Sequence, residues 1–553
     1  MLDCAASSSA NNEAKINSTS LMDIKVAFEA AVTNIARYGD TDVFPSPFEN
    51  HVLFDRPTEV VDLLQQIHSN LDEWLNHHPP DNIDTLQPVG YTGYRWVTEI
   101  QYIWNAYFLA LTIPVAAAAE QKRLPESERS VFSYRFGFDP TTGKLFKDST
   151  WLDYKRRALE LSKRFGYSLV TDVSDFYPRI YHHRLENELK RLDLQNDLPF
   201  RIMKLLTHFS KTVSYGLPVG GPASRILAEI ALHPVDLHLN RAGIPFCRYT
   251  DDFHLFARSK EEAYYALAFL SDKLFNEGLS LQKSKTRILT SKELQEASQY
   301  LEPTAAGGEI SPENRLLGLS IRFDPYSPNR DEDYEVLRQA VRSIDIVKIL
   351  AREISKTAVD PLVTRQAVRA IQALSPDIRD KAIATLIDPD NIQILAPAFI
   401  TIMRLLRRIY DEIGEPVSER VDDFLVGLLE SRSHLLTNDL NLAYFLQVFG
   451  KQKTLRKEQL LIQTFAERAS PLIRRLIILI MAHWRAYYWL SDIKKRFGIL
   501  TSWERSAFII ASYYLGDEGS HWRGHFKFAF SPMETVIRDW YSQRFQNNTE
   551  VPF

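Results

Sequence analysis

YTDDFHLF, at residues 249–256, sets two adjacent aspartates before a short run with strand character. The preceding run, IPFCRY (244–249), has the same character, so the two runs predict a β-hairpin whose acidic turn contains Asp251 and Asp252. Alternation along the second strand places Phe253 and Leu255 on one face and His254 on the other. An Asp-Asp pair in a turn is most often only a polar turn, so its meaning depends on the rest of the chain.

Two further segments supply partners for this turn. In SLVTDVSDFYPRIYHH (168–183), an apolar strand delivers Asp172 near its end. In GLPVGGPASRILAEIAL (216–232), a turn rich in glycine and proline leads into an apolar helix. The joint occurrence of the three segments in this order is far more specific than any one of them alone.

Carboxylates from neighbouring strands suit nucleotidyl transfer. Two Mg²⁺ ions about 3.5–4 Å apart can stabilise the attacking and leaving oxygens of that reaction, and Mg²⁺ prefers carboxylate and phosphate oxygens. We therefore interpret Asp172 and Asp251 as the main ligands of Mg²⁺ or Mn²⁺, with the carbonyl of Val173 as a further ligand. Asp252 would be a weaker ligand or lie near the primer end. Like charges crowded in this way are costly unless cations bind.

The three segments resemble motifs A, B and C of reverse transcriptases. TDVSDFYPRI, GLPVGGPASR and YTDD carry this resemblance, and LQKSKTRIL (281–289) and RLLGLSI (315–321) are similar to motifs D and E. The resemblance covers roughly residues 131–325 and implies a palm like that of group II intron enzymes. It also implies RNA-directed DNA polymerase-like nucleotidyltransferase activity on dNTPs, with catalytic roles for Asp172, Asp251, Asp252 and Lys285.

Several substrate contacts follow from the same resemblance. Tyr177 matches an aromatic steric gate, whose ring clashes with a 2′-hydroxyl and so favours deoxynucleotides; the alternative is a core aromatic. Lys285 matches the motif D lysine, either a proton donor to pyrophosphate or a phosphate contact, and the alternative is a solvated surface lysine. Arg135, in VFSYRFGF (131–138), would clamp a triphosphate or form an ordinary salt bridge. The remaining substrate-binding candidates are Phe176, Gly220 and Ser224.

One position departs from the usual pattern. Reverse transcriptases commonly carry glutamine after the proline of motif B, where this chain has Val219, which cannot hydrogen-bond through its side chain. This variant, with RYGDTDVFPSPFEN (37–50) and ERSAFIIASYYLGDEGSHWR (504–523), looks like the abortive-infection and defence-associated reverse transcriptases of bacteria, of the AbiK type. That resemblance implies antiphage defence and DNA synthesis without a conventional template, primed by a protein tyrosine.

The implied partners are dNTPs, a single-stranded DNA product attached covalently to the protein, RNA, and further copies of the chain in a trimer or hexamer. Among the 24 tyrosines, Tyr38 is a candidate primer, with an ordinary packed tyrosine as the alternative. Two other functions stay open. The first is a template-copying RNA-directed DNA polymerase of retron or retroelement type, and the second is a non-catalytic helical assembly scaffold.

Composition limits the other possibilities. The formal net charge is −4, which is not the strongly basic balance of a protein held on nucleic acid by its whole surface, so any such contact is local. Basic clusters at Arg404, Arg407 and Arg408 and at Lys155–Arg157 are candidates, or are solvated faces. The two cysteines, Cys4 and Cys247, offer no disulfide framework or cysteine-based zinc site.

The N-terminus lacks a secretion signal, and the apolar runs 107–119 and 476–482 are shorter than a membrane span. They predict buried helices, and we expect a cytoplasmic bacterial protein without membrane contact.

The chain divides by its secondary-structure pattern. Residues 1–20 are polar and predicted to be flexible, and 21–130 predict a helical N-terminal and fingers region with proline-rich interruptions. Residues 131–330 mix short strands, including 316–323, with helices, which predicts an α+β fingers and palm domain. From 331 to 553 helical spacing predominates, which predicts an all-α, HEAT-like repeat domain in place of a thumb, although no strict sequence period is present.

Overall fold

The predicted acidic hairpin forms one half of a four-stranded antiparallel sheet, the palm sheet. The computed structural model describes residues 23–194, 197–211, 213–298, 311–318 and 344–547, with Val341, Thr549 and Phe553. The strand order is β6-β7-β5-β8, with bounds β5 (Tyr167–Asp172), β6 (Phe246–Tyr249), β7 (Asp252–Ala257) and β8 (Arg287–Thr290). The register pairs Asp172 of β5 with Asp252 of β7. The predicted strand that contains Asp172 and both strands of the predicted acidic hairpin are confirmed.

Helices cover both faces of the palm sheet. On one face, α6 (Trp151–Phe165) lies against β5, β6 and β7. On the other face, α11 (Lys260–Asn276) contacts β5 and β7 and lies beside α10 (Pro222–Arg241). Strand alternation directs Arg248 of β6 toward α10, where it meets Glu229. It directs His254 of β7 toward α6 instead.

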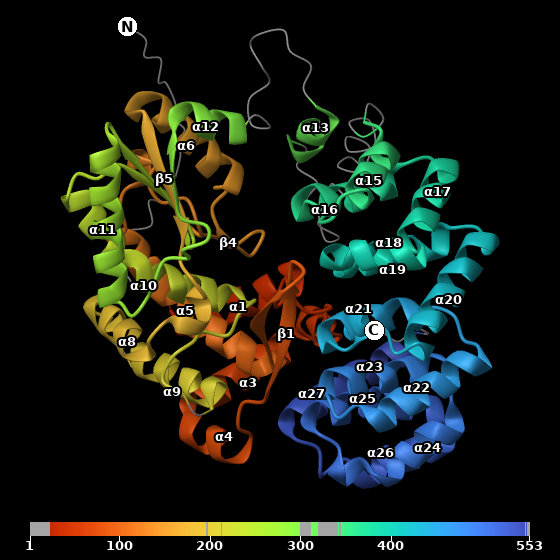
Figure 1. Cartoon of the computed structure of the whole chain (residues 1–553). Helices are drawn as coiled ribbons and strands as arrows, with labels where there is room; N and C mark the ends of the chain where they lie inside the picture. Colours follow the sequence, from red (N-terminus) through yellow and green to blue (C-terminus); the bar gives the residue numbers. More distant parts are fainter. Residues whose placement is uncertain are drawn as a thin grey trace, which may run out of the picture.

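The other elements of the N-terminal half surround this core (Figure 1). The helices are α1 (Ile24–Tyr38), α2 (Glu49–Asp55), α3 (Pro57–Ser69), α4 (Leu71–His77), α5 (Tyr102–Lys122), α7 (Phe176–Arg179), α8 (His182–Arg191), α9 (Leu198–Ser210) and α12 (Ser291–Ala297). β3 (Phe136–Asp139) and β4 (Lys144–Phe146) form a small separate hairpin.

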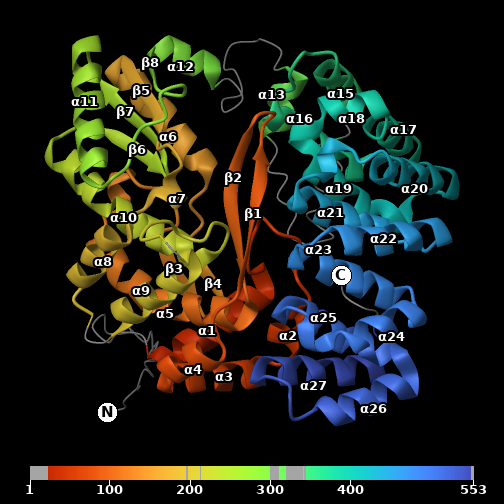
Figure 2. The same ribbon diagram turned by 60° about the horizontal axis from the view of Figure 1, so that its bottom comes forward.

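The helical prediction for 21–130 is wrong over residues 82–100. There β1 (Asn82–Val89) and β2 (Gly93–Ile100) form a long antiparallel hairpin, the N-terminal hairpin. Figure 2 shows it standing between the palm and the C-terminal helices. Buried residues, including Val97 and Glu99, are confined to the end of the hairpin that contains residues 82 and 100, so the sequence shows little of the alternation that indicates a strand.

The described part of the C-terminal half is entirely helical, as predicted. Its helices are α13 (Pro312–Gly318), α15 (Ile346–Ile354), α16 (Pro361–Ala370), α17 (Pro376–Leu386), α18 (Pro389–Ile394), α19 (Phe399–Ile409), α20 (Glu415–Glu430), α21 (Asp439–Phe449), α22 (Leu455–Glu467), α23 (Pro471–His483), α24 (Tyr487–Lys495), α25 (Ser502–Ala511), α26 (Gly516–Phe526) and α27 (Pro532–Gln546). One row stacks in the order α16, α19, α21, α23, α25, α27, and this row faces the N-terminal half (Figure 1). The HEAT-like repeat assignment stays a prediction.

The strand predicted at 316–323 is wrong over its described residues. Residues 316–318 are the end of α13, which packs against α16 of the helical half. Residues 319–323, which complete the predicted strand and include the end of the motif E resemblance (315–321), lie outside the described residues, as do residues 1–20 and the proposed boundary at 330.

Among the described residues, α5 alone is long and apolar enough to cross a membrane by length and composition. Of its most apolar window, 89% is buried inside the fold, so it is the central core helix of the N-terminal half. The buried helix predicted at 107–119 is therefore confirmed, with flanking residues extending it.

A buried charge cluster joins the N-terminal hairpin to the helical half. Arg475 of α23 pairs with Glu99 of β2, and the charges of Asp40 and Glu49 also act on Arg475. All four side chains are buried, so one cation faces three carboxyl groups. Burial raises the pKa of Asp40, of Glu49 and, to about 7, of Glu99.

We expect E99Q to weaken the pH dependence of folding stability. The Glu99 carboxyl has an ordinary pKa of 4.5, which burial raises to about 7 in the folded protein. The folded state binds this proton more tightly, so the stabilisation is complete below about pH 4.5 and is lost as pH rises through about 7. The thermal midpoint of the parent protein should therefore fall between about pH 4.5 and 7, and E99Q should remove part of that fall. E430Q, at an exposed carboxylate, is the control; equal slopes in E99Q and the parent would contradict the assignment.

Candidate active site

The turn between β6 and β7 is held in an unusual conformation. Thr250 has φ of 56°, in the left-handed region that β-branched residues rarely adopt. Both its backbone polar groups are hydrogen-bonded: its N–H donates to Ser133 Oγ at 2.8 Å, and its carbonyl accepts from the Arg248 guanidinium at 2.8 Å. Strain of this kind persists only where surrounding contacts enforce it, and it concentrates at functional sites.

Arg248 is the centre of a buried ionic network beneath this turn. Its guanidinium is fully buried and donates to both carboxylate oxygens of Asp236 at 2.6–2.7 Å and of Glu229 at 2.9–3.2 Å. With the Thr250 carbonyl, these contacts use all five N–H donors of the guanidinium. Both acids belong to α10, so this helix positions the turn.

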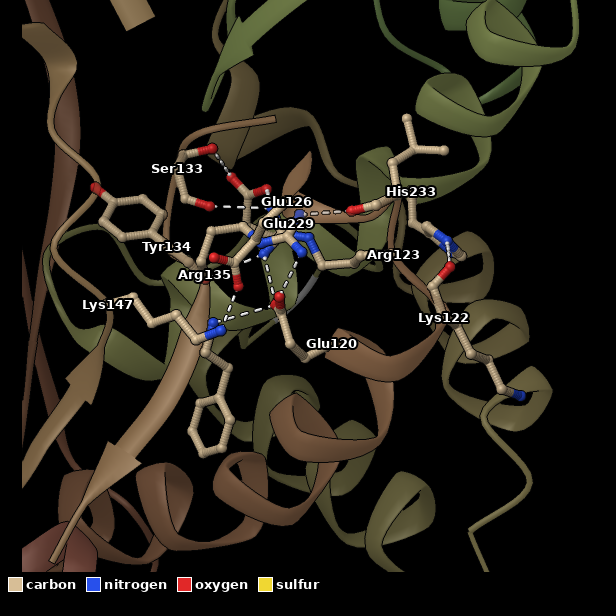
Figure 3. Close-up of polar contacts among 12 residues, drawn as sticks. Glu120, Lys122, Arg123, Glu126, Ser133, Tyr134, Arg135, Lys147, Glu229 and His233 are labelled. Atoms are coloured by element: carbon tan, nitrogen blue, oxygen red, sulfur yellow. Dashed lines mark hydrogen bonds and ion pairs between the residues drawn. The ribbon is translucent and has the colours of Figure 1, made fainter. Parts of the chain in front are cut away.

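Figure 3 shows how the same network continues to α5. Arg123 donates to Glu229 at 2.7 Å and lies 3.3 Å from Glu120, while Ser133 Oγ donates to Glu229 at 2.5 Å. Glu229 therefore receives donors from α5, from the segment before β3 and from β6. The support of the catalytic turn is one connected set of buried charges.

The structure brings the predicted acidic residues together at one end of the palm sheet. Asp172 ends β5 opposite Asp252, and the N–H of Val173 donates to the Asp251 carbonyl at 3.1 Å. Lys285, from the loop before β8, donates to Asp172 Oδ2 at 2.6 Å. The other carboxylate oxygen of Asp172, Oδ1, is buried without a hydrogen-bond partner among the described residues.

Electrostatics at this site reflect crowded carboxylates. Burial, and then the charge of Asp252, raises the pKa of Asp251 to about 6. Burial also raises the pKa of Asp252, against the opposing effect of Lys155. The hydrogen bond to Asp172 raises the pKa of Lys285. Within the described residues, no group of three or more His, Cys, Asp or Glu side chains is arranged as a ready metal cage.

A cavity of about 310 Å³, the substrate pocket, lies beside the acidic end of the sheet. Its lining includes Tyr134, Gly220, Arg225 and Tyr249, together with residues 38–42 of the N-terminal segment. A pocket of this size suits a small ligand such as a nucleotide. Gly220 has φ of 134°, and a Cβ there would lie 2.3 Å from Thr41 Oγ1, so the close approach requires glycine.

Tyr177 is half-buried in α7, with its ring edge-on to that of Phe176. Burial, and then Tyr134, raises the pKa of its hydroxyl, and the charges of Arg225 and Asp251 also act on it. Its role as a steric gate stays a prediction.

Three predicted substrate contacts are not supported by the structure. Phe176 is 3% exposed and belongs to the core, because the short α7 turns adjacent aromatics to different sides. Ser224 is buried in the first turn of α10, in a small space shared with residues 40–41 and with residues 98–100 of β2. Arg135 is buried and bound to Glu120 at 2.6 Å and to the Leu124 carbonyl at 2.8 Å, so it forms the structural salt bridge of the alternative interpretation.

Two side chains near the site were not predicted to bind substrate. Arg225 lines the pocket, stacks 5.3 Å from the Tyr134 ring and pairs with Asp42 at 2.7 Å. The only sequence signal for it is its position directly after GLPVGGPAS. Lys155 of α6 lies over the Trp151 and Tyr154 rings, 3.3 Å from His254 Nε2, and its pKa is lowered by burial.

Carboxylates at the end of an antiparallel palm sheet, beside a nucleotide-sized pocket, define a nucleotidyl-transferring polymerase palm. Residues 118–321 match the family described as reverse transcriptase (RNA-dependent DNA polymerase). The chain thus carries a reverse transcriptase domain and is an RNA-directed DNA polymerase-like nucleotidyltransferase.

The solved structure of apo telomerase from Candida tropicalis is similar at 11% identity and a TM-score of 0.26, over 68% of this chain and 72% of the telomerase chain. No curated protein matches the sequence.

Replacing Arg248 should destabilise the palm strongly. R248M leaves Glu229 and Asp236 buried without their shared cation, and the loss of one partner from a buried ion pair costs about 3–5 kcal/mol. Thermal unfolding followed by tryptophan fluorescence measures the effect. R258M, at an exposed arginine just after β7, should change stability by no more than about 0.5 kcal/mol.

A combined variant, R248M with E229Q and D236N, should recover part of the loss because the uncompensated charges are gone. A midpoint for R248M equal to that of R258M would show that the network does not hold the palm.

Proposed function

We propose that this protein is a Mg²⁺-dependent DNA polymerase that acts in antiphage defence in bacteria and leads to abortive infection. It would build single-stranded DNA from dNTPs without a conventional template, starting from a protein tyrosine, within a trimer or hexamer. The observation that carries the polymerase activity is the meeting of Asp172, Asp251, Asp252 and Lys285 at one end of the palm sheet.

The residues at this end fit a divalent metal. Asp172 Oδ1 is buried and lacks a hydrogen-bond partner among the described residues, and burial, followed by the neighbouring carboxylates, raises the pKa of Asp251. Hard oxygen donors of this kind suit Mg²⁺ or Mn²⁺. Asp172 and Asp251 would hold the metal with the Val173 carbonyl. When bound, it would neutralise charge on the attacking and leaving oxygens.

The protein's own side chains would divide the remaining tasks. Tyr177 would exclude a 2′-hydroxyl by steric contact beneath the sugar. Lys285, which donates to Asp172, would supply a proton to the leaving pyrophosphate. Gly220 lets the backbone of the motif B loop approach the pocket closely.

Synthesis without a template is supported by what covers the motif B loop. Val219 offers no polar side chain, and its carbonyl accepts from the N–H of Thr98 on the N-terminal hairpin at 3.4 Å. Thr41 closes over Gly220. N-terminal residues of the same chain thus contact the motif B loop, and this supports the proposal that the loop does not read a templating base.

A priming tyrosine must present its hydroxyl near the nucleotide. Tyr38 lines the substrate pocket and is 45% exposed, and its hydroxyl donates to the Thr142 carbonyl at 3.1 Å. Denaturing electrophoresis of the purified protein, followed by sequencing of any DNA that stays attached, tests the priming step. Loss of attached DNA in Y38F would assign the primer, and its retention would exclude Tyr38.

D251N should reduce dNTP incorporation by more than about a hundredfold, because it removes a direct metal ligand. Loss of a residue that only supports a metal ligand typically costs about 10–100-fold. The assay is incorporation of labelled dNTPs by purified protein with Mg²⁺ or Mn²⁺, with circular dichroism to confirm folding. D272N, at an exposed carboxylate of α11, is the matched control and should retain activity. Full activity in D251N would overturn the polymerase proposal and favour the scaffold function.

Y177A should relax sugar selection. The preference for dNTPs over rNTPs, measured as the ratio of kcat/KM values, should fall by at least about tenfold, equivalent to roughly 1.4 kcal/mol. Y264A, at an exposed tyrosine of α11, should leave the ratio unchanged. An unchanged ratio in Y177A would mean that the ring is a packing residue only.

Product sequencing distinguishes the two polymerase functions. A product complementary to an added RNA would support the template-copying alternative, whereas products unrelated to added strands support the proposal. Phage plating on cells that express the parent or the D172N/D251N double variant tests the defence role. Equal protection by both proteins would separate defence from catalysis.

A further inference from the structure

Four arginines from two parts of the chain lie along one surface between the N-terminal hairpin and the helical half. They are Arg95 of β2, Arg365 and Arg369 of α16, and Arg404 of α19, and we call them the arginine row. Arg365 donates to the Pro397 carbonyl at 3.2 Å, and Arg95 donates to the Gln87 side chain at 2.5 Å. Arg365 is half-buried and the other three are exposed, and no ion pair joins any of the four to a carboxylate within the described residues.

The charges that lower the pKa values of Arg365 and Arg369 belong to other members of the row. Partial loss of water, and then the charge of Arg95, lowers the pKa of Arg365. Partial loss of water, and then the charges of Arg404 and Arg365, lowers the pKa of Arg369. A guanidinium does not give up its proton in a protein, so this repulsion persists in the free protein. A bound polyanion would remove it.

The row begins at the substrate pocket. Arg404 donates to the backbone carbonyl of Asp42 at 3.1 Å, and the Asp42 carboxylate pairs with Arg225. Both Asp42 and Arg225 line the pocket. From there the row passes to α16, whose Arg365 and Arg369 are one helical turn apart on the same face.

The row ends at Arg95 on the N-terminal hairpin. Near the tip of that hairpin, Tyr91 donates to the Ile394 carbonyl at 2.6 Å and accepts from the N–H of Val359, so the hairpin is fastened to the helical half. Figure 2 shows the hairpin running alongside α16 and α19. The cations thus line a fixed boundary between two parts of the fold.

We propose that the arginine row binds the phosphate backbone of a single nucleic-acid strand that continues from the substrate pocket. A single line of cations matches one backbone, as in grooves that track single strands by charge. The formal net charge of −4 means that such binding must be local, and this row supplies a local site. The inference rests on the proposed function, because the polymerase supplies the strand.

Of the basic clusters suggested by the sequence, only Arg404 belongs to this row. Arg407 donates to the carbonyl of Phe553, and Arg408 donates to the Gln372 side chain at 3.0 Å, so both serve contacts inside the helical half. Sequence adjacency therefore does not define the site; the approach of β2, α16 and α19 does.

The test is the salt dependence of strand binding by full-length protein that carries D251N, which prevents extension during the measurement. Fluorescence anisotropy reports the affinity for labelled oligo-dT and oligo-U of about 20 nucleotides, between about 50 and 200 mM KCl. For single strands, log affinity against log salt falls with a slope of about −0.7 for each phosphate neutralised. Adding R365Q and R369Q should make the slope shallower by about 1.4 and weaken binding at low salt.

The matched control is R432Q with R456Q, which removes two exposed, ion-paired arginines and changes the net charge equally. This control should keep the parent slope, and thermal midpoints confirm folding of both variants. Tighter binding of oligo-dT identifies a DNA product strand, and equal or tighter binding of oligo-U identifies RNA as an accepted strand.

An unchanged slope in folded R365Q/R369Q would overturn the proposal. So would a change of sedimentation from oligomer to monomer without a change in slope, since the row would then be an interface between copies. The binding assay does not require catalysis, so the two proposals can fail separately. If the protein without D251N incorporates no dNTPs but the salt slope still changes with R365Q/R369Q, the proposed polymerase activity is refuted and the strand site is retained.

Discussion

The buried guanidinium of Arg248 is the interaction on which the catalytic end of the palm depends. It satisfies two carboxylates of α10 and, with its remaining N–H, the carbonyl of Thr250. Thr250 adopts a left-handed φ that costs roughly 1–3 kcal/mol and persists only where other contacts enforce it. Arg248 and Ser133 enforce it from both sides of the residue. The turn therefore sets Asp252 opposite Asp172 rather than leaving the two aspartates on a mobile loop.

Burying these charges has a structural purpose other than stability. Buried ion pairs are often no more stabilising than apolar residues of similar volume, because removal from water costs several kcal/mol for each ion. The network instead fixes the positions of the elements that it joins. Glu229 receives donors from α5, from the segment before β3 and from β6, so these elements cannot shift independently of the turn.

The N-terminal segment and hairpin bind the two halves of the chain into one body. Tyr444 of α21 donates to the Val43 carbonyl at 2.8 Å, and Arg475 of α23 pairs with Glu99. The same N-terminal stretch covers Gly220 and Val219 of the motif B loop. The helical half is thus linked to the motif B loop through residues 40–100 of the same chain.

The sequence by itself determined the palm strands, the acidic turn, the helix after the GLPVGGPAS turn and the identity of the carboxylates. These features depend on local periodicity, turn residues and short spacings, which a single chain displays directly. Only the tertiary structure decided the roles of Arg135, Ser224 and Phe176, because burial and ion pairing depend on partners from other elements. It also decided the strands at 82–100, which are buried mainly at one end of their hairpin, and the arginine row, whose members run from residue 95 to residue 404. Charges far apart in sequence become one site only when folding brings their elements together, and no local pattern records that approach.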